Sequence, residues 1–527
     1  MNYADLFRVT LPETALEVAA LVVLIVDLGF LRKAALKVRV AVAALLGVAG
    51  CGAALWALQF RGDSDLSYNG DIVYSALLGI GGYVPVAQIG ILVLTTLTLL
   101  LLIDSDFTNH VGEFVAVILM AATGGLLIAA ARDLLVIFVG LELLSLGLYI
   151  LTAFAKRSGK SAEAALKYYL FGGMSAAFVL FGFSYFYGLS GSTNLTAINE
   201  TISSSGASPL LYVAWILVVA GLGFKVAAVP FHLWAPDTYE GAPATAAAFI
   251  ASVSKVASFT LLITISWTWL RGSLPIEGEM HAIEAVGQSY FRAWSGVAPI
   301  LLLVAAASMV VGNLAALAQV SVRRLLAYSA IAHAGYILLG LFTQAQYSGK
   351  GSAATFIVAT GVSAVRSTDA VLFYVLTYGL TTIGAFGVVS LVERATGSDR
   401  LDSFLGLHKR NPVLAAVLLV LFLSLAGIPP LVGFWAKFNL FAAVLGVSAG
   451  PVPFALVALA VALSAVSLYY YLQVLKRAYV MPAIDESPIK VHPVTIIVLV
   501  GIAAAVVLFG CFPALLQGWI ASFYPAV

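Results

Sequence analysis

Apolar runs of around 20 residues recur from one end of this chain to the other. Coiled into an α-helix, a run of that length spans the hydrocarbon core of a membrane, which is about 30 Å thick. Only 10% of the 527 residues are charged, whereas a soluble domain carries about 25%. A β-barrel would need short segments that alternate strictly between apolar and polar residues, and the sequence does not show this pattern. The chain is therefore predicted to be an all-α polytopic membrane protein.

The apolar runs divide the chain into about fourteen predicted transmembrane helices. The twelfth run is long because it is interrupted: Pro429 and Pro430 follow Ser424 closely, remove backbone donors and clash with the preceding turn. The predicted segments lie near 11–31, 38–60, 80–103, 113–131, 133–155, 163–189, 209–229, 242–270, 296–320, 324–345, 366–394, 412–447, 453–476 and 493–520.

The loops between these segments carry unequal positive charge. Of the 27 Lys and Arg residues, 17 lie in the loops that follow odd-numbered segments, and seven lie on the other side. Basic residues accumulate on the cytoplasmic side of membrane proteins. Both termini are therefore predicted to lie on the side away from the cytoplasm. The remaining three lysines lie within apolar segments.

Four charged residues lie deep in predicted helices, namely Glu142, Lys225, Lys255 and Lys437. Each costs roughly 2.5–3.5 kcal/mol at mid-membrane on insertion scales, so all four are expected to face the protein interior or water. Glu142 and Lys225 could form a structural ion pair, but three lysines against one deep carboxylate leave excess positive charge. A buried lysine without a full partner readily loses its proton. These residues are therefore interpreted as groups that take up and release protons.

Two predicted helix breaks support this interpretation. Glycines at 221 and 223 and Pro230 flank Lys225, and Pro429-Pro430 precede Lys437. Unwound backbone at membrane depth is tolerated only where it is buried in protein or lines a wet cavity. Both lysines are therefore expected to have water or polar backbone within reach.

Two histidines complete the set of candidate residues. His232 follows the first break, and His333 lies inside the tenth predicted helix. Imidazole titrates near physiological pH. A lone histidine within the membrane is more often a hydrogen-bonded core residue, so both interpretations stay open for His232 and His333. Lys437 is expected to lie on the same buried polar axis as Lys255, with His333 the best candidate to bridge the two amines.

A weak internal repeat is also visible. Arg-Asp-Leu-Leu at 132–135 opens the fifth helix, and Arg-Arg-Leu-Leu at 323–326 opens the tenth. Glu142 and His333 each follow the first arginine by ten residues. The two helices would start on opposite sides of the membrane, which is typical of inverted-topology repeats.

The sequence predicts no redox centre, metal site or cofactor site in this chain. The two cysteines stand alone in apolar segments, and the six histidines are scattered. Two isolated cysteines cannot supply the thiolates of an iron–sulfur cluster, and they do not form a Cys-x-x-Cys motif. No Gly-x-Gly-x-x-Gly motif follows a strand, as dinucleotide binding would require.

Three motifs resemble one known family. Residues 229–243 read Val-Pro-Phe-His-Leu-Trp-Ala-Pro-Asp-Thr-Tyr-Glu-Gly-Ala-Pro, which resembles the signature of the antiporter-like subunits of respiratory complex I and of Mrp-type antiporters. The Tyr-Glu-Gly-Ala-Pro ending resembles the N-type branch, as do residues 425–438. Residues 324–335 are a third match, and the resemblance spans essentially the whole chain.

The resemblance implies a fold of fourteen helices with two inverted five-helix repeats, in which helices 7 and 12 are broken. The implied division is helices 1–3 in residues 1–110, the first repeat (helices 4–8) in 111–270, the second repeat (helices 9–13) in 296–480 and helix 14 in 490–527. The loop near 271–292 has no assigned role.

The resemblance also implies a function, namely proton translocation in the respiratory chain of a bacterial cytoplasmic membrane, as a translocase subunit of NADH–quinone oxidoreductase. Glu142 would tune Lys225, Lys255 would relay the proton, and Lys437 would connect to the opposite exit, with His232 and His333 on the same path. NADH, FMN, iron–sulfur clusters and quinone would bind to partner subunits. The expected partners are the neighbouring M-type subunit, the small membrane subunits and lipids, and no nucleic acid.

Two alternatives remain at this point. An Mrp-type sodium/proton antiporter subunit would share the fold and the lysines, although the Tyr-Glu-Gly-Ala-Pro motif disfavours it. A membrane enzyme that binds quinone directly would need a polar pocket beside a redox centre, for which the sequence shows no ligands.

Overall fold

The computed structural model describes residues 7–61, 77–205, 208–269, 298–344, 367–447, 451–483 and 485–523. Every named element in these ranges is a helix. The elements are α2 (Leu11–Ile25), η1 (Val26–Phe30), α3 (Leu36–Ala57), η2 (Leu58–Phe60), α5 (Tyr83–Leu102), α6 (Val111–Ala130), α7 (Leu134–Thr152), α8 (Gly159–Ser190), α9 (Leu195–Ser205), α10 (Pro209–Val226), α11 (Trp234–Gly241), α12 (Ala244–Trp269), α14 (Ala298–Leu317), α15 (Val322–Gln344), α17 (Ser367–Thr396), η4 (Leu401–Phe404), α18 (Leu407–Arg410), α19 (Pro412–Ala426), α20 (Val432–Val447), α21 (Pro451–Tyr479), α22 (Pro493–Cys511) and α23 (Pro513–Ala521).

The prediction of an all-α polytopic membrane protein is confirmed. Within the described ranges, twelve helices are long and apolar enough to cross a membrane. The other two of the fourteen predicted spans are interrupted: the first divides into α2 and the π-helical turn η1, and the twelfth divides into α19 and α20. The loop near 271–292 lies outside the described residues.

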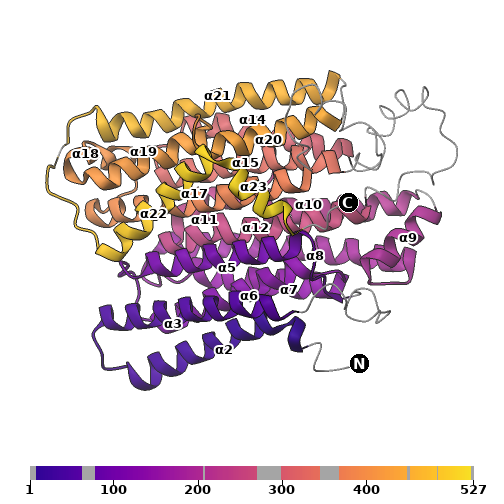
Figure 1. Ribbon diagram of the computed structural model, residues 1–527, viewed down its shortest axis with the longest axis horizontal. Helices are drawn as coiled ribbons and strands as arrows, with labels where there is room; N and C mark the ends of the chain where they lie inside the picture. Colours follow the sequence, from indigo (N-terminus) through magenta and orange to yellow (C-terminus); the bar gives the residue numbers. More distant parts are fainter. Residues whose placement is uncertain are drawn as a thin grey trace.

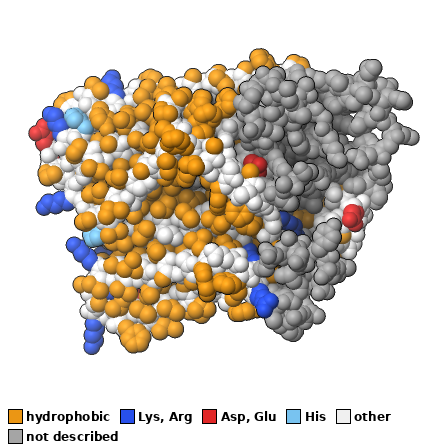
Figure 2. Space-filling model, viewed as in Figure 1, with side chains coloured by type: hydrophobic (Ala, Val, Ile, Leu, Met, Phe, Trp, Pro, Cys, Tyr) orange, Lys and Arg blue, Asp and Glu red, His pale blue; other side chains and the backbone are white. Residues whose placement is uncertain are grey.

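The helices lie side by side as a flat bundle, with α2 and α3 at one edge and α21 at the other (Figure 1). The central helix α12 is buried throughout its apolar window, because its small residues let neighbouring helices approach closely. Peripheral α8 is only 33% buried over its apolar window. Figure 2 shows the result on one face: hydrophobic side chains cover the middle, and basic side chains gather at the end that carries α18.

Two isolated β-bridges reveal the internal repeat. Asp133 before α7 pairs with Asn194 after α8, and Ser321 before α15 pairs with Arg400 after α17. The flanking hydrogen bonds match as well. The amides of Leu134 and Val322 donate to the carbonyls of residues 193 and 399, at 2.9 Å in both cases. The helix pair α7–α8 is therefore closed by the same backbone pairing as α15–α17.

Close glycine contacts fix the register of this repeat. A Cβ on Gly124 of α6 would lie 2.5 Å from the amide nitrogen of Leu144 in α7, and a Cβ on Gly312 of α14 would lie 2.5 Å from that of Ala332 in α15. Both pairs are related by an offset of 188 positions, as are the bridge residues Asp133 and Ser321. Helices α6 and α14 therefore pack on α7 and α15 in one common register.

This register corrects the alignment inferred from sequence, which paired Glu142 with His333. The common offset of 188 places Ser145 opposite His333, three residues further along. The Arg-x-Leu-Leu pattern misled the alignment because such residues recur at many helix starts, whereas the true register depends on where two helices touch.

The two repeats run in opposite senses. Lys167 near the start of α8 and Arg324 near the start of α15 both bind Asp237, so these two helix starts lie at one face of the bundle. Helix α7 ends at this same face, since Thr152 at its end accepts a hydrogen bond from Ser161 in α8. Helix α7 therefore ends where α15 begins.

Both predicted helix breaks are present and have the same geometry. Helix α10 is followed by Ala227 with φ 58°, and α19 is followed by Gly427 with φ 87°. Each of these two residues donates its backbone N–H to carbonyls three and four residues earlier. A cis proline follows at 230 and at 430, so the two breaks correspond at an offset of 200.

Candidate functional site

Two of the three lysines predicted from sequence lie in the first repeat and are buried. Lys225 and Lys255 expose 9% and 2% of their surface. The Lys225 amine donates to the hydroxyl of Ser145 on α7 at 2.5 Å. The Lys255 amine reaches from α12 to the carbonyl of Val226, the last residue of the broken helix α10. Neither side chain extends toward lipid.

Lys437 lies against the second break and exposes 6% of its surface. Its amine donates to the carbonyls of Leu425 and Ala426, at 3.1 and 3.0 Å, and to the hydroxyl of Ser464 on α21, at 2.7 Å. A Cβ at position 427 would lie 3.0 Å from the lysine side chain. Glycine is therefore favoured here for two reasons: it leaves room for the lysine, and it readily adopts the left-handed backbone conformation.

Lys255 and Lys437 therefore occupy equivalent places although they come from different helices. Val226 and Ala426 correspond at the offset of 200, and each offers its carbonyl to a lysine amine. The last carbonyls of a helix lack intrahelical partners and carry partial negative charge. A protonated amine is stabilised at this position without a carboxylate, and it can release its proton without breaking an ion pair.

The ion pair considered above between Glu142 and Lys225 is not formed in this structure. Among the described residues, no carboxylate lies within 4.0 Å of the Lys225 amine. Ser145, one helical turn beyond Glu142 on α7, takes that place, and Glu142 itself is partly exposed. Sequence reasoning missed Ser145, because its only signal was a hydroxyl three residues after the glutamate.

His333 lies between tyrosines beside the second break. Its Nδ1 is 2.8 Å from the hydroxyl of Tyr374, and its ring packs against that of Tyr378. A cavity of about 10 Å³ adjoins the histidine and is also lined by Ser424 and Leu425 of α19. That is roughly the smallest volume that holds one water molecule. The structure thus brings His333 to the broken helix that holds Lys437.

Helix α17 separates His333 from Lys255. Tyr378 of α17 contacts His333. At the next residue, a Cβ added to Gly379 would lie 3.5 Å from the Cβ of Ser252 on α12. Ser252 stands one helical turn before Lys255. Contacts through Tyr378 and Gly379 of α17 therefore lead from His333 to the helix that carries Lys255.

His232 is not brought into contact with the lysines. It lies half-buried in the turn after α10. Over the part of the chain that the structure describes, its Nδ1 is buried without a hydrogen-bond partner. A role for His232 in proton transfer stays a prediction.

A cluster of buried hydroxyl and amide groups beside Lys437 was missed by sequence reasoning. The ring of Tyr336 lies under the Lys437 amine at 5.4 Å. The Tyr336 hydroxyl accepts from the amide of Asn313 at 3.1 Å, and Asn313 accepts from Tyr470 at 3.2 Å. The neighbouring residue, Tyr471, forms a hydrogen bond between its hydroxyl and that of Ser329. The only signal in the sequence for this cluster was Tyr336, which lies three residues after His333 on a helix face that otherwise consists of core residues.

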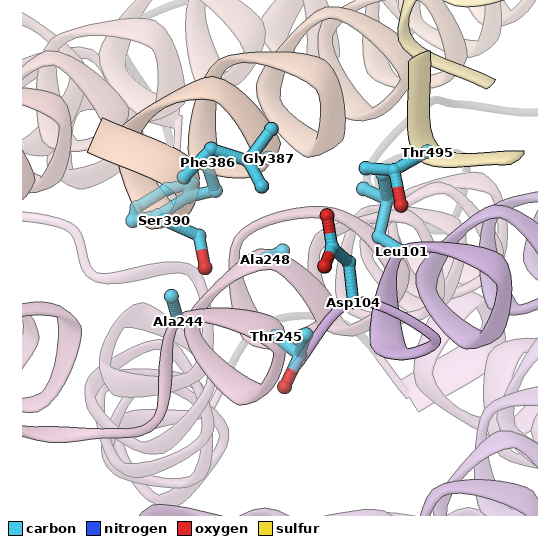
Figure 3. Close-up of a pocket in the computed structure, with 10 residues that line it drawn as sticks. Leu101, Asp104, Ala244, Thr245, Ala248, Phe386, Gly387, Ser390 and Thr495 are labelled. Carbon is cyan, nitrogen blue, oxygen red and sulfur yellow. The ribbon is translucent and has the colours of Figure 1, made fainter. Parts of the chain in front are cut away.

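A separate recess lies between α5, α12, α17 and α22 (Figure 3). The carboxylate of Asp104 points into it, accepts from Arg394 at 2.6 Å and also accepts from the backbone N–H of His492 at 2.9 Å. Asp104 therefore ties the end of α5 to α17 and to the start of α22. The recess stands apart from the lysines, and its carboxylate holds helices together.

Among the residues that the structure describes, no group of three or more His, Cys, Asp or Glu side chains could hold a metal ion. The buried titratable groups around the second helix break are instead a lysine, a histidine and tyrosines.

Comparisons with known proteins agree with this arrangement. The family model described as "NADH:quinone oxidoreductase/Mrp antiporter, TM" matches residues 131–275, 287–358 and 347–464. NADH-quinone oxidoreductase subunit N 2 of Acidobacterium capsulatum is 46% identical and covers 99% of both chains. Subunit N of Anaeromyxobacter sp. is 34% identical over 96% of this chain and 94% of its own.

Solved structures give the same result for the fold. A chain of respiratory complex I from Thermus thermophilus, with bound aureothin, is 33% identical with a TM-score of 0.72, over 96% of this chain and 98% of that chain. A chain of the Mrp complex from Dietzia sp. has a TM-score of 0.72 at 20% identity, over 97% and 98% of the two chains. The second likeness concerns the fold alone.

Proposed function

This chain belongs to the NADH:quinone oxidoreductase/Mrp antiporter family of transmembrane proteins, and from that premise we propose that it moves protons across a membrane as an N-type subunit of an NADH–quinone oxidoreductase. The observation that carries the proposal is the placement of Lys255 and Lys437 on the open ends of two broken helices. The relatives that bear the N-type name extend over the full chain, which favours this function over sodium/proton exchange.

The geometry supports a relay in which neutral groups hold each amine. Lys225 takes up a proton while bound to Ser145, and the field of Glu142 one turn away favours its charged form. Release of that proton passes charge toward Lys255, whose amine binds the carbonyl of the residue next to Lys225. The proton then crosses α17 near Tyr378, reaches His333 and continues to Lys437.

The driving energy would come from other subunits. This chain would bind no redox cofactor, and NADH, FMN, iron–sulfur clusters and quinone would lie on its partners, which include the M-type and small membrane subunits. We place it in the bacterial cytoplasmic membrane with both termini on the periplasmic side, as its 17 to seven distribution of basic loop residues favours. The proposed division is residues 1–110, 111–270, 296–480 and 490–527, and the common repeat register supports it.

Substitution of Lys255 tests the function. In sealed vesicles that contain the assembled oxidoreductase, Lys255→Ala is expected to abolish most proton pumping and to slow quinone reduction. The matched control is Lys409→Ala, since the Lys409 side chain is 56% exposed. Wild-type pumping by the Lys255 variant would contradict the proposal. Sodium-driven proton release that survives without NADH oxidation would instead favour the antiporter.

A further inference from the structure

We propose that Asn313 and Tyr470 are positioning residues of the proton path, which hold the ring of Tyr336 against the amine of Lys437 and so set how firmly that amine keeps its proton. The inference rests on the proposed function, because it assigns these residues a part in loading and unloading Lys437. It concerns side chains of α14, α15 and α21 around the second helix break.

The charge of Lys437 is stabilised by neutral groups only. Over the described ranges, no carboxylate lies within 4.0 Å of its amine, which instead meets two backbone carbonyls, one serine hydroxyl and the face of Tyr336. A cation over an aromatic face within about 6 Å is attracted by the ring quadrupole, most strongly where water is excluded. The ring of Tyr336 therefore favours the charged amine over the neutral one.

Asn313 and Tyr470 form a hydrogen-bonded clamp on the hydroxyl of Tyr336. Within this clamp the amide of Asn313 has only one orientation. Its Nδ2 donates to the carbonyl of Met309 at 2.8 Å and to the hydroxyl of Tyr336 at 3.1 Å, so its Oδ1 must face Tyr470. That oxygen accepts from the Tyr470 hydroxyl at 3.2 Å. All three side chains are almost completely buried. The Tyr336 ring is therefore held at its hydroxyl, while the lysine amine lies over its face.

The first repeat shows that the fold does not require this clamp. Helices α6 and α7 pack in the same register as α14 and α15, at an offset of 188. In that register Gly125 stands where Asn313 does, and Leu148 stands where Tyr336 does. A purely structural need of this helix pair would arise in both repeats. The amide and the tyrosine occur only in the repeat in which a lysine lies over the ring.

Several titratable groups face Lys437 from the helices packed against α20, and all are neutral in their ordinary form. Helix α19 contributes none, and on α22 the sole titratable group described is the exposed Cys511. The buried histidine and tyrosines on α15, α17 and α21 are His333, Tyr336, Tyr374, Tyr378, Tyr470 and Tyr471. The charged residues of these helices, such as Arg323, Asp369 and Arg477, lie in the first or last turns. A change in the pH dependence at Lys437 can therefore be assigned once the tyrosines are varied one at a time.

The test is the pH profile of proton pumping by the assembled complex in sealed vesicles. Tyr336→Leu removes the ring, so Lys437 should lose its proton at lower pH, and the alkaline limb of the profile should move about one pH unit toward acid. Tyr336→Phe keeps the ring but loses the hydroxyl that Asn313 binds, so it should give a smaller shift of the same sign. Tyr470→Phe deletes a single oxygen and should give a smaller shift of the same sign, even where Tyr336→Leu fails to assemble.

Two controls separate the possible results. Tyr469→Phe, at the neighbouring residue that is 59% exposed, should leave the profile unchanged. If Tyr336→Leu and Tyr470→Phe lower pumping equally at every pH, the clamp is structural and the inference is overturned. Lys437→Ala is measured in the same assay. If Lys437→Ala loses pumping but the tyrosine variants keep the wild-type pH profile, the inference alone is overturned. If Lys437→Ala pumps like the wild type, the proposed function is overturned as well.

Discussion

At the scale of single residues, the interior amines are partnered by hydroxyls and carbonyls. Lys225 binds Ser145, and Lys437 binds Ser464 together with two carbonyls. Hydrogen bonds to neutral acceptors are weaker than those to carboxylates, so they hold a protonated amine without trapping its proton. A carboxylate within contact distance would make each lysine a permanent ion pair. Glu142 is partly exposed and forms no ion pair with Lys225 among the described residues.

The first prediction concerns Ser145. Ser145→Ala removes the hydroxyl that the Lys225 amine contacts, and an unsatisfied buried donor costs about 1–3 kcal/mol. We expect pumping to fall about tenfold, and Ser145→Thr to retain most of it, measured as protons moved per electron in sealed vesicles. The exposed Ser184, which binds only a local carbonyl, provides the control Ser184→Ala. Equal activity of the Ala and Thr variants at 145 would show that the hydroxyl is not used.

The lysines could be found from sequence because a charge inside an apolar run stands out. Ser145 and Ser464 could not, since hydroxyl residues are common in spanning helices and many only bind their own backbone, as Thr95 and Thr98 do. Partner choice depends on which helix faces mesh, and that information is tertiary.

At the scale of helices, prolines made both breaks predictable and glycines set the packing. The prolines at 230, 429 and 430 mark where α10 and α19 end. Where the helices touch could not be predicted, because Gly124 and Gly312 look like any other glycine in an apolar run. The inferred repeat register was wrong by three residues because the sequence does not show where the helices touch.

The second prediction uses these contacts. Gly312→Ala would place a methyl group 2.5 Å from the backbone of Ala332, which cannot move aside without shifting α15. Overpacking of this kind costs about 1–3 kcal/mol or more, so we expect a lower thermal unfolding midpoint of the purified complex. Gly52→Ala is the matched control. Nothing lies within 4 Å of its Cβ, and alanine is the better helix former. Similar midpoints for the two variants would refute the close contact.

At the scale of the whole molecule, ion pairs join units that lie far apart in the sequence. Asp237 and Glu240 on α11 bind Arg324 of α15, and Asp237 also binds Lys167 of α8. Burial alone would raise the pKa of Asp237, but hydrogen bonds from Lys167 and Arg324 outweigh it and hold that pKa below its usual value. The segment that follows the first break is thereby tied to the helix that carries His333.

The third prediction follows from the sign of this shift. A carboxylate with a lowered pKa in the folded state adds stability above its unfolded pKa, about 3.9, and loses it as the pH falls through the folded value. Asp237→Asn should lower the unfolding midpoint by a constant amount from about pH 8 to about pH 5, and the gap should close below about pH 4. Thermal scans of the detergent-solubilised protein at each pH would measure this. A gap that persists in acid would argue against an ionic origin.

Buried ion pairs also attach the first two helices to the rest of the bundle. Arg61 binds Glu13 of α2 at 2.6 Å and Gln88 of α5 at 2.6 Å, and Gln88 reaches the carbonyl of Leu126 in α6. At the other end of α2, Asp27 binds Arg39 and accepts from the backbone of α6. The count of basic residues included Arg39 and Arg61 only as loop charges, since pairing between separate helices leaves no local pattern in the sequence.

The fourth prediction tests whether this attachment depends on pairing rather than on charge itself. Arg61→Met leaves the Glu13 carboxylate buried at 3% exposure without its cation, and breaking a buried pair in this way costs about 3–5 kcal/mol. The double variant Glu13→Gln with Arg61→Met removes both charges and lets Gln88 bind the new amide, so most of the loss should be recovered. Thermal midpoints of the single and double variants, compared with Glu13→Gln alone, complete the cycle. A double variant as unstable as Arg61→Met would show that the arginine stabilises the junction by filling space, and the ion pair would then have no separate role in holding α2 against α5 and α6.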